Sequence, residues 1–191
     1  MPMRTSNGVK DPIVQAGAAV LRQKAKPLSK KDIGSAAVQK LIKRMSAILK
    51  KEEYGVALAA PQVGEMLRLF VVAGKIFTPT PEGRGPDQSV GEKVLPDRVF
   101  INPEITKRSK SKQEMAEGCL SVRGKYGTVL RHEKVTLKAL DQRGAAVTYH
   151  GTGLVGHVFQ HECDHLEGVL YTDKAKTLRD DDETEDEAKS S

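Results

Sequence analysis

The chain has 191 residues, of which 38% are hydrophobic and 29% charged, and this length suits one compact domain. No apolar run approaches the ~18 residues that a membrane-spanning helix needs. Residues 1–17 also lack the apolar stretch of a secretory signal. Two cysteines cannot form a disulfide framework, so we expect a reducing, cytoplasmic setting. These features exclude integral membrane proteins and small disulfide-rich scaffolds.

The net charge of +6 is unevenly distributed along the chain. Residues 180–191 contain seven acids and one lysine, which leaves +12 on the preceding 179 residues. This tail has almost nothing to bury, so we expect residues 180–191 to be disordered and residues 1–179 to form a single domain. A basic body favours acidic neighbours, RNA among them, but no specific nucleic-acid motif is present. The basic charge is therefore interpreted as a solvated surface.

In chain order, the first predicted element is a helix after Ser35, which is a suitable N-cap residue. Apolar residues follow it at the spacing of one helix face: Val38, Leu41, Ile42, Met45, Ile48 and Leu49. Residues 77–97 are rich in Pro and Gly and predict a long surface loop.

Stretches rich in Val and Ile predict strands at residues 67–73, 98–105, 127–141 and 145–151. Residues 141–144 (DQRG) are typical of a hairpin connection between antiparallel strands. A second helix is predicted from Thr152 to Glu167, closed by Gly168. These elements predict an α+β fold, with mostly antiparallel strands packed around the late helix and one amphipathic helix near the N-terminus.

The late helix contains HECDH at residues 161–165. Positions i and i+4 share one helix face, so His161 and His165 can bind the same ion. Glu162 lies about 100° further around the helix, from where it can act on a water beside the metal without being a ligand. Cys163 points away from both histidines and is interpreted as a small core residue. The alternative is a surface helix whose histidines are merely polar.

Two histidines leave such a site short of a ligand, because hydrolytic metal sites usually have three protein ligands and one open position. After His165 the sequence offers no His or Glu at the zinc-protease spacing. Upstream, Cys119 in EGCLS is the best candidate, since a thiolate binds soft and borderline metals strongly. A lone cysteine is more often a buried hydrophobic residue, but beside an HExxH that lacks its third ligand a metal ligand is favoured. His157, one turn before His161, is interpreted as a pocket or packing residue.

A third segment, GVALAAPQVG at residues 55–64, combines small residues with one amide. Small residues let a substrate backbone approach closely, and Gln62 can donate to a developing oxyanion. Taken alone, an Ala- and Gly-rich turn before a strand is common.

Together, the three segments resemble the peptide deformylase family, which carries GxGxAAPQ, EGCLS and QHExDHL in this order. Here they stand as GVALAAPQ (55–62), EGCLS (117–121) and QHECDHL (160–166). The resemblance extends from about Asp11 to Lys174. It implies that residues 1–179 form a single catalytic domain followed by the acidic tail.

The resemblance implies a metal-dependent hydrolase that removes the N-formyl group from the N-terminal formylmethionine of newly made polypeptides and releases formate. It implies Cys119, His161 and His165 as ligands of one divalent ion per chain, natively Fe(II), with Zn, Ni or Co as substitutes. Glu162 is implied as the general base, and Gln62 with the backbone N–H of Leu120 as the oxyanion donors. The ribosome is the implied neighbour.

An apolar pocket must receive the methionine side chain. The residues expected to bind substrate are Gly55, Val56, Ala57, Glu117, Gly118, Tyr126, Leu154, His157 and Val158.

The chain departs from the family pattern in three places. Ala57 stands where the family has a second glycine, and it would be strained there if the backbone were left-handed. EGCLS continues with Val122 and Arg123, where the family commonly has a hydrophobic residue and proline. The tail is acidic, whereas some bacterial relatives dock on the ribosome through a basic C-terminal helix.

Two alternatives to this enzyme stay open. An HExxH metallopeptidase is disfavoured by the missing downstream ligand. A non-catalytic, metal-binding or ribosome-associated relative is disfavoured by the presence of both Gln62 and Glu162, which a binding protein would not need.

Overall fold

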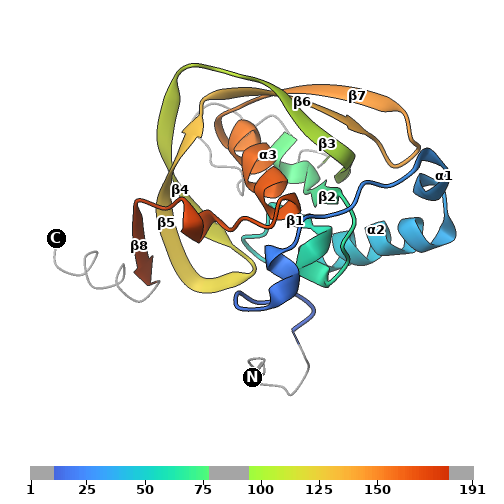
Figure 1. Cartoon of the computed structure of the whole chain (residues 1–191), viewed down its shortest axis with the longest axis horizontal. Coiled ribbons are helices and arrows are strands. Elements are labelled where there is room, and N and C mark those ends of the chain that lie inside the picture. The colour runs from blue at the N-terminus through green and yellow to red at the C-terminus, as the bar shows by residue number, and fades with distance from the viewer. Residues whose placement is uncertain (1–10, 78–94, 181–191) are drawn as a thin grey trace.

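The computed structural model describes residues 11–77 and 95–180 (Figure 1). Its helices are α1 (Lys30–Ile33), α2 (Ala36–Leu49) and α3 (Gly153–Leu166). Its strands are β1 (Ala57–Ala59), β2 (Leu69–Val72), β3 (Arg98–Arg108), β4 (Lys112–Cys119), β5 (Val122–His132), β6 (Lys134–Leu140), β7 (Ala146–Thr152) and β8 (Thr177–Asp180). Within this part of the chain, no helix is long and apolar enough to cross a membrane.

The strands form two antiparallel sheets. One has the order β1-β2-β3-β6-β7, and the other has the order β4-β5-β8. Helix α3 lies in the middle of the molecule and contacts strands of both sheets (Figure 1). The predicted α+β fold, with mostly antiparallel strands around the late helix, is confirmed.

Helix α2 forms where its apolar spacing predicts it. The Ser35 Oγ accepts a hydrogen bond from the Val38 N–H at 3.3 Å, which caps the first turn. The apolar face is buried, with Met45 fully inaccessible, and it packs in one cluster with Leu58 of β1 and Leu69 of β2. This packing fixes the start of the segment that carries Gln62.

Helix α3 is anchored by a second apolar cluster. Phe159 is fully buried, and its ring centre lies 5.2 Å from that of Phe100 on β3. Gly168 follows the helix with φ +75°, the left-handed conformation that a glycine after a helix commonly adopts. The predicted helix and its C-terminal glycine are therefore confirmed.

Two glycines set how closely α3 approaches β7. A Cβ added at Gly151 would meet the Gly156 Cα at 2.8 Å, and one at Gly156 would meet the Gly151 carbonyl oxygen at 2.8 Å. Real Cβ atoms do not approach backbone atoms this closely, so side chains at these positions would push the helix away from the sheet.

The structure corrects the predicted strands at three points. Residues 127–141 are divided at Glu133 between β5 and β6, which pair with different strands. Strands β1, β4 and β8 lie outside the predicted strands. Asp180, taken as the first residue of the disordered tail, instead ends β8, and its carboxylate pairs with Lys125 of β5. The rest of the predicted tail, residues 181–191, and most of the predicted loop, residues 78–94, lie outside the described residues.

Candidate active site and metal centre

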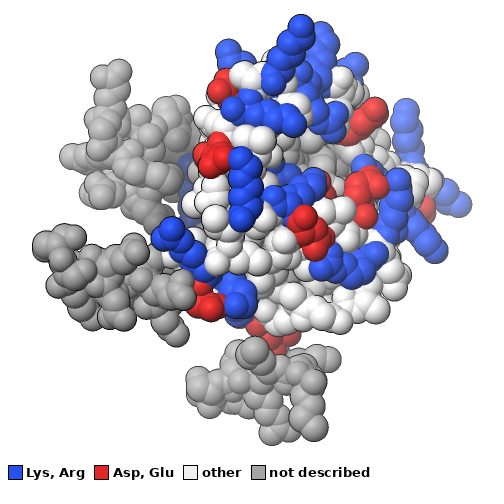
Figure 2. Space-filling view, turned by 60° about the vertical axis from the view of Figure 1, so that its left-hand side comes forward, with Lys and Arg blue, Asp and Glu red and all other residues white. Residues whose placement is uncertain are grey.

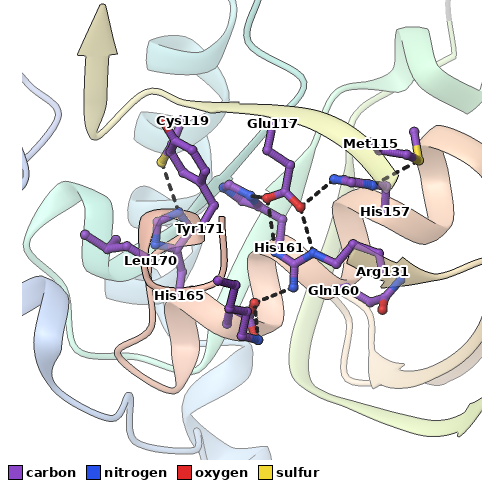
Figure 3. Close-up of polar contacts among 12 residues, drawn as sticks. Met115, Glu117, Cys119, Arg131, His157, Gln160, His161, His165, Leu170 and Tyr171 are labelled. Atoms are coloured by element: carbon purple, nitrogen blue, oxygen red, sulfur yellow. Dashed lines mark hydrogen bonds and ion pairs between the residues drawn. The ribbon is translucent and has the colours of Figure 1, made fainter. Parts of the chain in front are cut away.

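Three potential metal ligands converge where the end of β4 meets α3. The Cys119 Sγ lies 3.2 Å from the His165 Nε2 (Figure 3). One ligand atom each from Cys119, His161 and His165 lies within 4.8 Å of the other two. One thiolate and two imidazoles suit Zn²⁺, Fe²⁺, Co²⁺ or Ni²⁺. The three residues predicted as ligands are therefore brought together in a geometry that fits one transition-metal ion.

The Glu117 carboxylate orients one of these ligands, His161, through the ring nitrogen that does not face the metal site. Its Oε2 lies 2.6 Å from the His161 Nδ1, and its Oε1 lies 2.6 Å from the His157 Nε2 (Figure 3). The Arg131 guanidinium donates to both carboxylate oxygens, at 2.7 and 3.0 Å. Because the Nδ1 of His161 is held by Glu117, its Nε2 is the nitrogen left to bind an ion.

The Glu117 side chain is buried, and burial alone would raise its pKa. Hydrogen bonds from His157, His161 and Arg131 outweigh burial and hold the pKa well below the ordinary value for glutamate. Glu117 was expected to bind substrate. Its carboxylate is instead occupied by these three partners, so any contact with a substrate falls to its backbone.

The two histidines differ electrostatically. Burial lowers the pKa of His165 well below the ordinary value, which keeps it neutral as a ligand must be. The pKa of His161 is instead raised well above the ordinary value. Burial lowers this pKa, but the contacts with Cys119 and Glu117 raise it by more. The Cys119 and Glu117 side chains therefore favour a positive charge at His161, either as a proton on its ring or as a metal ion bound to it.

Glu162 is buried on the same side of α3 as the ligands. Its Oε2 has no hydrogen-bond partner among the described residues, and the residue lines the adjacent cavity. Burial raises the pKa of Glu162 to about 7, against the opposing influence of His161. A buried carboxylate with a free oxygen beside a metal site is suited to proton transfer.

Gln62 is held with its amide nitrogen toward Cys119. Its Oε1 accepts the Ala59 N–H at 2.8 Å, so its Nε2 faces the Ser121 Oγ at 3.1 Å and the Cys119 Sγ at 3.6 Å. The Leu120 carbonyl accepts from the Gln15 Nε2 at 3.0 Å, which anchors the segment that carries the second predicted oxyanion donor.

A cavity of about 540 Å³ opens beside the ligands. All nine residues expected to bind substrate line it, together with Gln62, Leu120 and Glu162. Val158 is buried in the wall, and Leu154 is 38% exposed. The Tyr126 hydroxyl is buried and has no partner among the described residues.

Ala57 carries no strain. It pairs with Val72 in β1, and Asn102 is the one described non-glycine residue with a positive φ. The extra methyl of Ala57 therefore only narrows the cavity.

The second departure, Arg123, makes contacts that no local pattern predicts. Its guanidinium donates to both carboxylate oxygens of Glu52 at 3.0 Å, and its Nε donates to Asp11 at 2.9 Å. It also lines the cavity. Arg123 thus ties the start of β5 to the segment before β1 and to the start of the described chain.

Cys163 has a different environment. It packs against the apolar cluster of Phe159 and Leu166, and burial raises the pKa of its thiol to about 12. The thiol therefore stays protonated and is unsuited to bind a metal.

Comparisons with known proteins agree with this geometry. The family profile of polypeptide deformylases matches residues 10–181. The chain is 41% identical over 179 residues to a peptide deformylase of Symbiobacterium thermophilum, covering 92% of this chain and 73% of the relative. It is 42% identical over 154 residues to one of Dehalococcoides mccartyi, covering 81% and 79%.

Solved structures give the same result. A class I type b peptide deformylase from Acinetobacter baumannii, bound to Met-Ala-Ser, aligns with a TM-score of 0.73 and 32% identity over 91% of this chain and 99% of that one. One from Legionella pneumophila aligns with a TM-score of 0.71 and 37% identity over 86% and 85%. The chain therefore belongs to the peptide deformylase family and is a metal-dependent hydrolase that removes the N-formyl group from nascent polypeptides.

Proposed function

We propose that Cys119, His161 and His165 hold one divalent ion per chain, natively Fe(II), and that Glu162 carries the proton transfers of deformylation. The observation that carries this proposal is the convergence of the three ligand atoms within 4.8 Å, beside a buried carboxylate with a free oxygen. When bound, the ion supplies Lewis-acid activation of water and of the formyl carbonyl.

The Glu162 carboxylate takes a proton from the attacking water and passes it to the nitrogen of the leaving amine. The C–N bond of the formamide breaks, and formate and a free N-terminal methionine are the products. The Gln62 Nε2 and the Leu120 N–H donate to the formyl oxygen as negative charge develops on it. The hydrogen bond from the Ala59 N–H to the Gln62 Oε1 supports this role, because it fixes which end of the amide faces the site.

Specificity follows from size and from one apolar wall. A formyl carbon bears only hydrogen, so a narrow site admits it and excludes bulkier amides. Val56, Leu154, His157 and Val158 form the pocket for the methionine side chain in this proposal. The similar structure from Acinetobacter baumannii is bound to Met-Ala-Ser, which supports a site for an N-terminal methionine.

The substrate also suggests where the enzyme works. Since the substrates are nascent chains, we place the protein in transient proximity to the ribosome and in the cytoplasm. The native metal is tested by elemental analysis of protein purified without oxygen, with Fe as the expected result and Zn, Ni or Co as active substitutes.

The decisive assay compares two peptides. Formyl-Met-Ala-Ser should release formate, while the same enzyme should leave unformylated Met-Ala-Ser intact. Cleavage of the unformylated peptide would indicate a metallopeptidase instead. Metal binding without either reaction would indicate a non-catalytic relative.

A further inference from the structure

A second cavity, of about 680 Å³, lies beside α3, and its lining has more basic than acidic side chains. Different residues of α3 line the two cavities. The second cavity is lined by Gln160, Cys163 and Asp164, with Glu167 just after the helix. The active-site cavity is lined by His157, Val158, His161 and Glu162. Five basic side chains line the second cavity, against the acids Glu104, Asp164 and Glu167: Arg68, Arg108, Lys112, Arg131 and Lys174.

Most of these charges already neutralise one another. Asp164 pairs with Arg131 and Lys174, and Glu167 pairs with Arg68 and Lys24. Glu104, the third acid of the lining, is exposed and has no ion pair among the described residues.

Arg108 and Lys112 have no ion pair among the described residues. The Arg108 guanidinium donates to the Ile105 carbonyl oxygen at 3.4 Å, and both side chains are exposed. Among the described residues, the cavity thus presents two cations outside any ion pair, against the single unpaired acid Glu104, at the end where β3 leads into β4.

The cationic surface continues beyond the cavity. Lys107 lies near the end of β3 and Lys110 in the β3–β4 turn. The Lys134 carbonyl on β6 accepts the Ser109 N–H of this turn at 2.8 Å. We call these five exposed residues the basic turn: Lys107, Arg108, Lys110, Lys112 and Lys134. Lys and Arg side chains gather at the top of Figure 2, where this turn lies in Figure 1.

We propose that the basic turn and the adjoining cavity bind the phosphate backbone of RNA. Five cations spread over a turn and three strands, β3, β4 and β6, exceed what a single phosphate needs, so they fit a polyanion better than a small anion. The cavity lining contains no Phe, Tyr or Trp on which a base could stack. Binding is therefore by phosphate contacts and independent of sequence.

This inference rests on the proposed function in one respect: the proposed proximity to the ribosome is what brings the enzyme to RNA. Helix α3 separates the basic cavity from the catalytic one, since different residues of the helix line each. A chain bound to RNA through the basic turn keeps its catalytic cavity open to a nascent peptide.

The test is fluorescence anisotropy with a labelled RNA hairpin, measured between 50 and 200 mM salt. The variant Arg108→Ala/Lys110→Ala/Lys112→Ala should bind RNA at least about 10-fold more weakly at 100 mM salt, with a log–log salt slope reduced by about 2 to 3. The matched control, Lys40→Ala/Lys43→Ala/Lys50→Ala on and just after α2, removes the same charge and should stay within about 2-fold of wild type.

Three results would overturn the proposal: equal weakening in both variants, no RNA binding by wild type at 100 mM salt, or displacement of RNA by inorganic phosphate at similar concentration. Both variants should keep the wild-type melting temperature and formate release from formyl-Met-Ala-Ser. Because the RNA assay uses no formyl peptide, a failure of this proposal is distinguishable from a failure of the proposed function. The single variant Lys110→Ala should show a smaller loss if the triple variant folds poorly.

Discussion

The two sides of α3 are built differently, although they belong to one helix of 14 residues. On the catalytic side, the Glu162 Oε2 and the His165 Nδ1 are buried without hydrogen-bond partners among the described residues. On the opposite side, Asp164 pairs with Arg131 and Lys174, and the Gln160 amide bonds to the backbone of His132 and Gly156.

This difference shows how the fold supports a reactive site. Buried polar atoms without partners destabilise a protein, so they persist where a ligand or substrate supplies the partner. The other side of the helix holds the backbone in place with satisfied polar groups. Substitutions on the catalytic side of α3 should therefore change chemistry and metal binding. Substitutions on the opposite side should change stability.

Substituting the two cysteines tests the comparison between the two sides of α3, and it should give the largest effect. Cys119→Ala should lose most of the metal and lower kcat/KM at least about 1000-fold, because a bound ion is worth several kcal/mol to the transition state. Cys163→Ala, on the opposite side, should keep both. Metal content and formate release measure this, and equal metal content in Cys119→Ala and wild type contradicts the ligand assignment.

Glu162→Gln separates catalysis from metal binding. The amide keeps the size of the side chain but cannot take a proton, so kcat should fall by about 10²–10⁴-fold or more. Metal content should stay close to one per chain, and KM should change little, since the methionine pocket is untouched. His161→Ala should instead lose metal and activity together. Loss of metal in Glu162→Gln would make Glu162 a ligand.

Glu117→Gln tests the support of His161. Metal affinity should fall by about 10- to 100-fold, because the anion that orients the imidazole is gone. The protein should also lose about 1.5–3 kcal/mol of stability, because the two hydrogen bonds from Arg131 to a charged carboxylate are lost while its ion pair with Asp164 remains.

The matched control for Glu117→Gln is Asp164→Asn. It removes the other carboxylate of Arg131 without touching a ligand, so metal affinity should be kept. Titration with a competing chelator and thermal unfolding measure the two effects. Equal metal affinity in both variants rules out a special role for Glu117.

The smallest effect is expected away from both sides of α3, at the acidic tail. A chain ending at Asp180 should keep its melting temperature and its activity on a short formyl peptide. A chain ending at Lys176 lacks β8, which pairs with β5, and should melt a few degrees lower if about 1–2 kcal/mol is lost. A clear drop in the chain ending at Asp180 would show that residues 181–191 pack on the domain.

Much of the site is predictable from sequence because its signals are local. The spacing of His161 and His165 depends only on helix geometry, and Ser35 and Gly168 mark helix ends by their own chemistry. Cys119 needed more than spacing, because a lone cysteine is ambiguous until EGCLS is recognised beside the other motifs.

The supporting contacts were not predictable in this way. Arg131 meets Glu117 only through the pairing of β4 with β5, where Glu117 faces Gly127. Strand β4 itself was missed because its sequence, KQEMAEGC, has no run of Val or Ile, and its one buried residue is the charged Glu117. The strand is polar because it serves the site rather than the core.

The close approach of Gly151 and Gly156 has a genetic consequence. Gly156 lies five residues before His161, about 7.5 Å along the helix axis, so any displacement of the helix there is carried to the ligands. A misplacement of about 1 Å can cost roughly 100-fold in rate. In a scan of all single substitutions, Gly151 and Gly156 will therefore be as intolerant as the catalytic residues, although they bear no reactive group.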